Sequence, residues 1–239
     1  MIQFGMAESL ELERQGDVFI LRFRAGENRF TARMNDEFSL ALDEVEAADG
    51  AKALVTTGAE RFYSNGLDLD YMMSGDSEGA GAYLSDVLSL LARVLVFPAP
   101  TVAAVNGHAF GAGALLSVAQ DFAVMRSDRG WWCMPEIDMP APLHPGMVAL
   151  LRARLSPTTA HETIVTGRRW DGESAARAAI VASAVPESDV LSKAVERAEG
   201  LASKAHPLMR TLKESLYAPV VAALALPFDG SGGAPGLER

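Results

Sequence analysis

The sequence has few of the residues that form disulfides and structural metal sites. One cysteine, Cys133, occurs among 239 residues, so no intramolecular disulfide can form. This cysteine usage is typical of a reducing compartment, and we expect a cytoplasmic protein. The four histidines are scattered along the chain, which argues against a structural zinc site.

Basic charge and long apolar segments are also scarce. Lysine and arginine number 21 against 31 aspartates and glutamates, which gives a net charge of -10. A chain with this balance lacks a basic surface that could neutralise phosphates, so we expect no nucleic-acid partner. No apolar run approaches the ~20 residues that span a bilayer, and the N-terminus lacks the pattern of a secretory signal. We therefore expect no membrane partner either.

What the sequence does contain is a large apolar fraction, 49%, which is typical of a globular protein with a sizeable core. Periodicity and turn residues predict a hairpin over 10–24 and a helix after Thr31, its expected N-cap. Further strands are predicted at 53–57, 101–105, 122–125 and 180–185. Further helices are predicted at 67–73, 84–95, 114–119, 147–155, 158–165, 173–179, 191–203 and 208–216.

These elements divide the chain into two predicted regions. Residues 9–145 hold most of the strands, and residues 146–226 are mainly helical. The stretches 1–8 and 228–239 lack periodicity or are rich in glycine, so we predict flexible ends there. Residues 74–81 are predicted to form a mobile loop, and Pro219 is expected to break the last helix.

A strand, a glycine turn and a helix occur together twice. The strand at 101–105 is followed by the turn 106–113, in which Gly111 and Gly113 precede a helix of small residues. The strand at 53–57 is followed by the turn 61–66, which ends at Gly66 and opens a second helix. The first N–H groups of a helix lack intrahelical acceptors and carry partial positive charge. Two such turns could present two backbone N–H groups to one oxygen. Glycine turns of this kind also occur simply where a helix packs tightly on a sheet.

The segment 131–142 supplies the candidate acid or base. Glu136 lies between tryptophan, methionine and proline residues, and burial there would raise its pKa into a range that suits proton transfer. Asp138 is the rival: both side chains point the same way if the segment is extended, and they diverge if it coils. A solvent-facing carboxylate is an equally weighted alternative. Cys133 is expected to be an inert buried thiol, and a structural role for His108 ranks above a place in a pocket.

Four motifs and their spacing resemble one known family across residues 9–217. They are Ser64-Asn-Gly-Leu-Asp-Leu69, the run from Pro100 through Asn106-Gly-His-Ala-Phe-Gly-Ala-Gly113, Pro135-Glu136, and Val165-Thr-Gly-Arg-Arg-Trp-Asp-Gly-Glu-Ser-Ala175. The chain is similar in these positions to the crotonase, or enoyl-CoA hydratase/isomerase, superfamily. The resemblance implies an α/β (α+β) fold of the crotonase/ClpP-like type. That fold is a spiral of ββα units with a short C-terminal helical region, assembled as a homotrimer or homohexamer.

The resemblance also implies an acyl-CoA substrate whose thioester oxygen is held by the N–H groups of Leu67 and Ala112. Glu136 would be the catalytic acid/base. The other substrate-site positions implied by the motifs are Ser64, Gly66, Asp68, His108, Gly111, Gly113 and Leu115. Asp68 is also explained as a favourable negative charge in the first turn of its helix.

The reaction expected from the resemblance depends on Leu115. Family hydratases use two glutamates, and Leu115 stands where one of them would fall. The Δ3,Δ2-enoyl-CoA isomerase branch is similar to this chain, because it has an apolar residue there and a single glutamate. We therefore expect double-bond migration in a 3-enoyl-CoA, with no metal and no redox cofactor, in fatty acid metabolism.

Other readings of the same resemblance stay open. A hydratase, a thioesterase or a decarboxylase would need Asp138, His144 or a water molecule as a second group. A non-catalytic acyl-CoA-binding relative is the competing class of protein. The segment 138–145 also departs from the Gly-rich run usual in the family, which is expected to reshape the acyl pocket.

Overall fold

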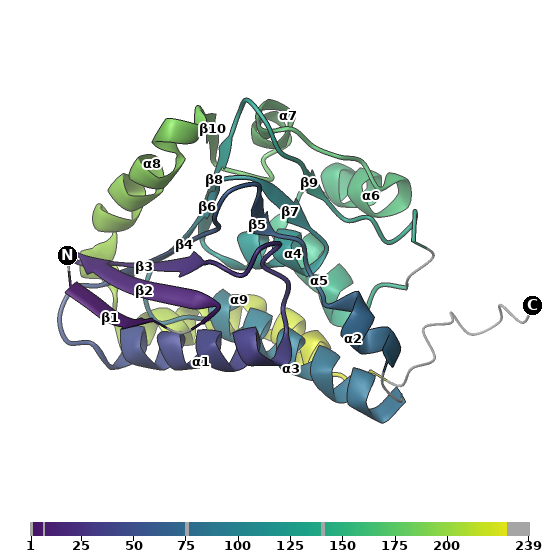
Figure 1. The fold of residues 1–239 in the computed structure, drawn as a ribbon, viewed down its shortest axis with the longest axis horizontal. Coiled ribbons are helices and arrows are strands. Elements are labelled where there is room, and N and C mark those ends of the chain that lie inside the picture. The colour runs from purple at the N-terminus through teal and green to yellow at the C-terminus, as the bar shows by residue number, and fades with distance from the viewer. Residues whose placement is uncertain (1, 7, 75–76, 140–141, 229–239) are drawn as a thin grey trace, which may run out of the picture.

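Two sheets of unequal size organise the fold (Figure 1). The computed structural model describes residues 2–6, 8–74, 77–139 and 142–228. The larger sheet has the strand order β1-β2-β3-β4-β6-β8-β10, and the smaller sheet has the order β5-β7-β9. The strands are β1 Ile2–Met6, β2 Leu10–Gln15, β3 Val18–Phe23, β4 Ala53–Thr57, β5 Phe62–Ser64, β6 Thr101–Val105, β7 His108–Phe110, β8 Phe122–Arg126, β9 Trp132–Cys133 and β10 Ser183–Val185.

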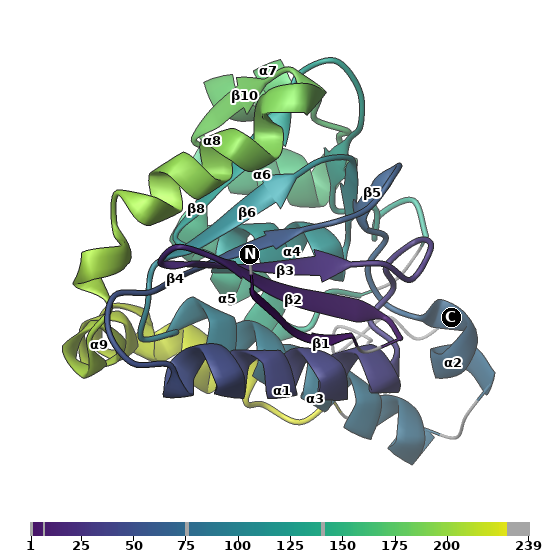
Figure 2. The ribbon, with the colours of Figure 1, turned by 60° about the vertical axis from the view of Figure 1, so that its left-hand side comes forward.

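Helices cover both faces of the larger sheet (Figures 1 and 2). They are α1 Ala32–Ala47, α2 Leu69–Ser74, α3 Ser77–Leu95, α4 Ala112–Ala119, α5 Pro145–Arg154, α6 Pro157–Thr166, α7 Gly172–Arg177, α8 Glu187–Glu199 and α9 Pro207–Leu224. In the two views α8 lies on one side of the large sheet, and α1, α3 and α9 lie on the other. This mixed α/β architecture confirms the predicted fold class.

Strict alternation along the central strands explains why both faces are covered. In β3, Val18 and Ile20 face the core beneath α8, whereas Phe19 and Leu21 face the main core. Successive side chains of a strand point to opposite faces, so a run of apolar residues requires a helix layer on each side. The central parallel strands are therefore fully buried, and their ends provide a rigid platform.

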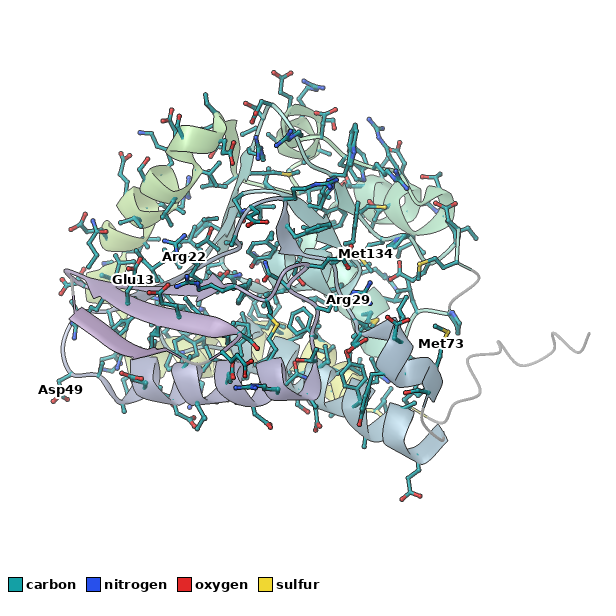
Figure 3. The ribbon with its side chains drawn as sticks, viewed as in Figure 1. Glu13, Arg22, Arg29, Asp49, Met73 and Met134 are labelled. Atoms are coloured by element: carbon teal, nitrogen blue, oxygen red, sulfur yellow. The ribbon has the colours of Figure 1, made fainter. Side chains whose placement is uncertain are left out.

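The hairpin and the helix N-cap near the start of the chain were predicted correctly from the sequence. β2 and β3 form the antiparallel hairpin, with Leu10 opposite Phe23. On its outer face Arg22 forms an ion pair with Glu13 at 3.4 Å (Figure 3). Thr31 is the N-cap of α1, and its side-chain oxygen accepts a hydrogen bond from the N–H of Met34.

Three boundary predictions were wrong. Residues 1–8 were expected to be flexible, but Ile2–Met6 forms β1 and pairs antiparallel with β2. Backbone pairing on an open sheet edge needs no side-chain periodicity, so the sequence pattern did not reveal it. The mobile loop predicted over 74–81 contains the first turn of α3, which starts at Ser77. The flexible end predicted over 228–239 begins one residue too early, because Phe228 packs against the main core; 229–239 lie outside the described residues.

Pro219 does not break the last helix, which contradicts the expectation. α9 continues through it to Leu224. Contacts on both sides hold the helix: Lys213 donates to the carbonyl of Phe97 and to Asp121, and Val220 is 5% exposed. Tertiary packing thus outweighs the missing N–H of proline.

We expect Pro219→Ala to raise the free energy of unfolding by about 1–3 kcal/mol, because proline inside a helix is strongly unfavourable relative to alanine. Pro219 is exposed, so the substitution removes no packing. Urea unfolding checks this. Pro207→Ala is the matched control, because Pro207 is at the first position of the same helix, where proline is tolerated. A change of less than about 1 kcal/mol is expected there. Equal effects of the two substitutions would contradict this account.

Candidate active site

The three strands of the smaller sheet bring the candidate residues together. β5, β7 and β9 are parallel, with Ser64 paired to Ala109 and Phe110 paired to Cys133. The segments that leave these strands therefore begin at the same sheet edge. Leu67 follows β5, Ala112 follows β7, and Glu136 follows β9 by two or three residues each. Residues that are distant in sequence thus become neighbours at this edge.

The turns after β5 and β7 are in direct contact. A Cβ atom on Gly66 would lie 2.6 Å from the carbonyl oxygen of Phe110 and 3.1 Å from the nitrogen of Ala112. A Cβ atom on Gly113 would lie 2.4 Å from the carbonyl oxygen of Ser64. Gly66 also has a φ of +86°, which side chains disfavour. Glycine is therefore required at both positions for the turns to approach this closely.

This contact places two backbone N–H groups at one cavity. Ala112 is the first residue of α4, so its N–H has no intrahelical acceptor. In the described part of the chain, the N–H groups of Ala112 and Leu67 donate to no other residue. Both residues line the same cavity, and Gly111, with a φ of +50°, turns the chain between β7 and α4. The pair can stabilise negative charge on one bound oxygen.

Glu136 lies beside this pair of N–H groups. One carboxylate oxygen, Oε1, is 3.6 Å from the position that a Cβ on Gly111 would take. The other, Oε2, is buried and has no hydrogen-bond partner. Burial removes water from the charged form and raises the pKa of Glu136 to about 7. The side chain can therefore accept or donate a proton near neutral pH.

The segment after β9 coils, so Asp138 diverges from Glu136. The N–H of Asp138 donates to the carbonyl of Pro135 at 3.0 Å, and the N–H of Met139 donates to the carbonyl of Glu136 at 3.2 Å. Asp138 is exposed and lies beside Gly167, away from the cavity lining. The geometry thus favours Glu136 between the two carboxylates that the sequence left open.

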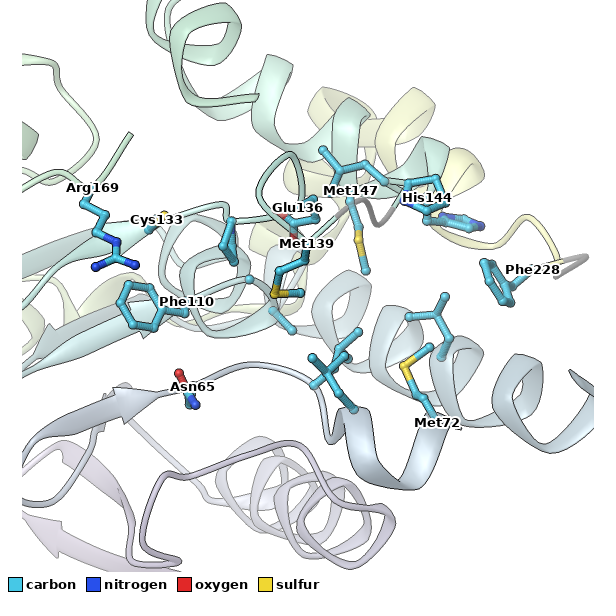
Figure 4. Close-up of a pocket in the computed structure, with 18 residues that line it drawn as sticks. Asn65, Met72, Phe110, Cys133, Glu136, Met139, His144, Met147, Arg169 and Phe228 are labelled. Carbon is cyan, nitrogen blue, oxygen red and sulfur yellow. The ribbon is translucent and has the colours of Figure 1, made fainter. Parts of the chain in front are cut away.

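The cavity has a volume of about 340 Å³ and a mostly apolar wall. Figure 4 shows Glu136 near its middle, with Asn65, Phe110 and Arg169 at one end and Met72, His144 and Phe228 at the other. The lining residues are Asn65, Leu67, Leu69, Met72, Leu84, Phe110, Gly111, Ala112, Cys133, Pro135, Glu136, Met139, Pro142, Leu143, His144, Met147, Arg169 and Phe228. Glu136 and the N–H pair thus lie between a polar end and an apolar end.

Of the other predicted substrate-site residues, Gly111 lines this cavity, whereas Ser64, Gly66, Asp68, His108, Gly113 and Leu115 are not among its lining residues. Ser64 supports the first turn, since its hydroxyl accepts from the N–H of Gly66 and donates to the carbonyl of Asn28. Asp68 accepts from the N–H of Tyr71 at the start of α2. Leu115 is fully buried in the main core. Roles of these residues in substrate binding stay predictions.

His108 lies at a different cavity. That cavity has a volume of about 120 Å³ and includes Arg61, Arg126 and Arg129 in its wall. Burial is the main cause that lowers the pKa of His108, and the surrounding arginines add to it. The ring lies 5.2 Å from that of Phe110, which does line the larger cavity.

Several lining residues were missed by the sequence analysis. Met139, Leu143 and Met147 read as ordinary loop and helix residues, and Phe228 was assigned to a flexible tail. The one sequence signal for these residues was that the segment 138–145 departs from the usual family pattern, which was expected to reshape the acyl pocket. Cys133 also lines the cavity, where burial raises the pKa of its thiol to about 11, so it is not a ready nucleophile.

Comparisons with known proteins show the family to which the chain belongs. A family model described as enoyl-CoA hydratase/isomerase matches residues 13–229. The chain belongs to the enoyl-CoA hydratase/isomerase family. Two relatives illustrate the range of the family: enoyl-CoA delta isomerase 2, peroxisomal, of Arabidopsis thaliana and carnitinyl-CoA dehydratase of Salmonella enteritidis. The first is 33% identical and covers 90% of this chain and 95% of its own length. The second is 32% identical and covers 87% of this chain and 80% of its own length.

Solved structures show the same family fold. A probable enoyl-CoA hydratase of Mycobacterium tuberculosis has a TM-score of 0.84 at 23% identity, covering 91% of this chain and 92% of its own. A family protein of Pseudomonas syringae has a TM-score of 0.85 at 21% identity, covering 94% and 97% of the two chains. Within the described residues, no helix is long and apolar enough to cross a membrane, and no group of side chains could hold a metal ion.

We expect Glu136→Gln to stabilise the folded protein above neutral pH. The wild-type carboxyl group has a pKa of about 7 in the folded protein against an ordinary value of 4.5, so folding favours its neutral form. That contribution is fully present below the unfolded pKa and is lost as pH rises through the folded pKa. Glutamine does not ionise, so the variant keeps its stability. Urea unfolding at several pH values should give similar stabilities near pH 4.5 and a growing advantage of the variant up to about pH 7. A difference that does not change with pH would contradict the burial of this carboxylate.

Proposed function

We propose that the protein is an enoyl-CoA isomerase that moves the double bond of a 3-enoyl-CoA to give the trans-2-enoyl-CoA. The observation that carries the proposal is the one carboxylate among the described lining residues, Glu136, whose Oε2 is buried and unpartnered. It lies beside two unpartnered backbone N–H groups in one apolar cavity. Homology to an enoyl-CoA delta isomerase at 33% identity supports the same choice within the family.

The first step is the removal of a proton from C2 of the substrate. The thioester oxygen accepts hydrogen bonds from the N–H groups of Leu67 and Ala112, which makes the C2–H bond more acidic. Glu136, in its ionised form, takes that proton, and the electrons move into the thioester carbonyl to give a conjugated enolate. The two N–H groups stabilise the negative charge that develops on the oxygen.

The second step returns the same proton at C4. The enolate extends over C2, C3 and C4, so protonation at C4 shifts the double bond to C2 and restores the carbonyl. A pKa of about 7 lets Glu136 serve as base in the first step and as acid in the second. The proton is conserved, and the reaction needs no metal or redox cofactor.

Water addition would need a second acid or base beside Glu136. Leu115 is apolar and buried, and Asp138 points away from the cavity. Both ring nitrogens of His144 already have hydrogen-bond partners in Gly146 and Leu226. These three positions favour isomerisation over hydration. We also propose a homotrimer or homohexamer, which sedimentation of the purified protein would test.

We expect Glu136→Gln to lower kcat for 3-enoyl-CoA isomerisation by about a hundredfold to ten-thousandfold, because the amide neither accepts nor returns the proton. The assay follows formation of the trans-2-enoyl-CoA product. Asp138→Asn is the matched control, since it removes a carboxylate two residues away that does not line the cavity. It should keep kcat within about threefold of wild type. Substantial activity of Glu136→Gln would refute the assignment, and a large loss in Asp138→Asn would move it to Asp138.

We expect kcat/KM to rise with pH to a plateau above about pH 7. The base form of Glu136 is needed in the free enzyme, and burial holds its pKa at about 7. Below about pH 7, kcat/KM should fall tenfold for each unit by which the pH decreases. A profile that stays flat down to about pH 5 would show that the base has an ordinary carboxyl pKa, and so is not a buried glutamate.

A further inference from the structure

The two ends of the main cavity differ in chemistry. On the side of Glu136 away from Arg169, the cavity is lined by residues of α2, α3 and α5 together with Met139 and residues 142–144 (Figure 4). The side chains there are methionine, leucine and proline together with His144, and Phe228 lies at the far end. The polar end is the only one with a charged side chain besides Glu136 among the lining residues that the structure describes. The apolar end is therefore suited to the acyl chain, and the polar end to the rest of a CoA thioester.

Phe228 reaches the cavity from the segment that follows α9. That helix ends at Leu224, and residues 225–228 cross from it to the cavity. The carbonyl oxygen of Phe228 is 3.2 Å from the position that a Cβ on Gly81 would take, so the segment lies against the start of α3. It also packs against the main core. The backbone of Phe228 thus lies against α3, and the residue lines the cavity.

His144 anchors this segment. Its Nδ1 accepts a hydrogen bond from the N–H of Gly146, which places the ring proton on Nε2. Nε2 then donates to the carbonyl oxygen of Leu226 at 3.1 Å. His144 is 5% exposed, and a Cβ on Gly146 would lie 2.6 Å from the Cα of Leu224. The backbone at the start of α5 is therefore packed against the backbone at the end of α9. This contact, at Leu224, is two residues before Leu226.

We propose that Phe228 closes the distal end of the acyl pocket and determines the longest acyl chain that the enzyme accepts. The proposal rests on the isomerase function only where it is tested by enzyme activity. Its test by acyl-CoA binding does not depend on that function. His144 is a positioning residue, because it acts through the carbonyl of Leu226.

The lining of the apolar end indicates an unsubstituted acyl group, and the position of Phe228 at its far end indicates one of limited length. No charged side chain lines the apolar end in the described structure, and His144 has no free nitrogen. An acyl group with a quaternary ammonium or a carboxylate would therefore lose its hydration without a partner. This separates the pocket from one that would take a carnitinyl group.

The test compares Phe228→Ala and Phe228→Trp with wild type in the full chain. Saturated octanoyl-, decanoyl-, dodecanoyl- and hexadecanoyl-CoA are titrated by calorimetry, and kcat/KM is measured for the matching 3-enoyl-CoAs. Leu40→Ala is the control, because it truncates an apolar side chain that is 67% exposed on the outer face of α1. Circular dichroism confirms that each variant is folded.

We expect wild type to bind hexadecanoyl-CoA at least tenfold more weakly than decanoyl-CoA. Phe228→Ala should remove most of that difference, and Phe228→Trp should shift the preference to shorter chains. Leu40→Ala should keep the wild-type profile. Carnitinyl-CoA should bind at least tenfold more weakly than octanoyl-CoA.

An unchanged chain-length profile in both Phe228 variants would overturn the proposal, as would an equal loss of affinity for every chain length. Absence of isomerase activity with an intact shift in binding would instead refute the proposed reaction and leave the role of Phe228 standing.

Discussion

The close contact between two glycine turns is the constraint on which the rest of the site depends. Gly66 and Gly113 let the turns after β5 and β7 approach to distances that a Cβ would prevent. Only in that arrangement do the N–H groups of Leu67 and Ala112 face one cavity. The parallel pairing of β5, β7 and β9 then fixes where Glu136 enters, because all three segments leave the same sheet edge. The larger sheet, covered by helices on both faces, provides the rigid support for this edge.

The position of Glu136 links catalysis to stability. A carboxylate with a buried, unpartnered oxygen is unfavourable for folding above neutral pH, but the same burial gives it a pKa of about 7. A residue with that pKa can both remove and return a proton, which is what movement of a double bond requires. The core of the protein therefore tolerates an unfavourable group at the position where the proposed reaction needs one.

Much of the site could be predicted from the sequence, because its parts are local. A strand followed by a glycine turn and a helix start can be recognised in a few residues, which predicted the two turns. The family resemblance then assigned the two N–H groups to Leu67 and Ala112. The residue pattern alone could not choose between Glu136 and Asp138, because the choice depends on whether the segment coils, and backbone hydrogen bonds decide that. The family resemblance pointed to Glu136. The apolar pocket could not be predicted either, since Met72, Met147 and Phe228 come from three distant segments. β1 and the passage of α9 through Pro219 were missed because sheet pairing and tertiary contacts outweigh local preference.

In the proposed reaction, one carboxylate and two N–H groups move a double bond without adding water. The most direct measurement is proton NMR of the products that the purified protein forms from a 3-enoyl-CoA and, separately, from a trans-2-enoyl-CoA. The account predicts that the first substrate gives trans-2-enoyl-CoA, and that neither substrate gives 3-hydroxyacyl-CoA. Accumulation of 3-hydroxyacyl-CoA from either substrate would contradict it, because hydration needs a second acid or base in the cavity.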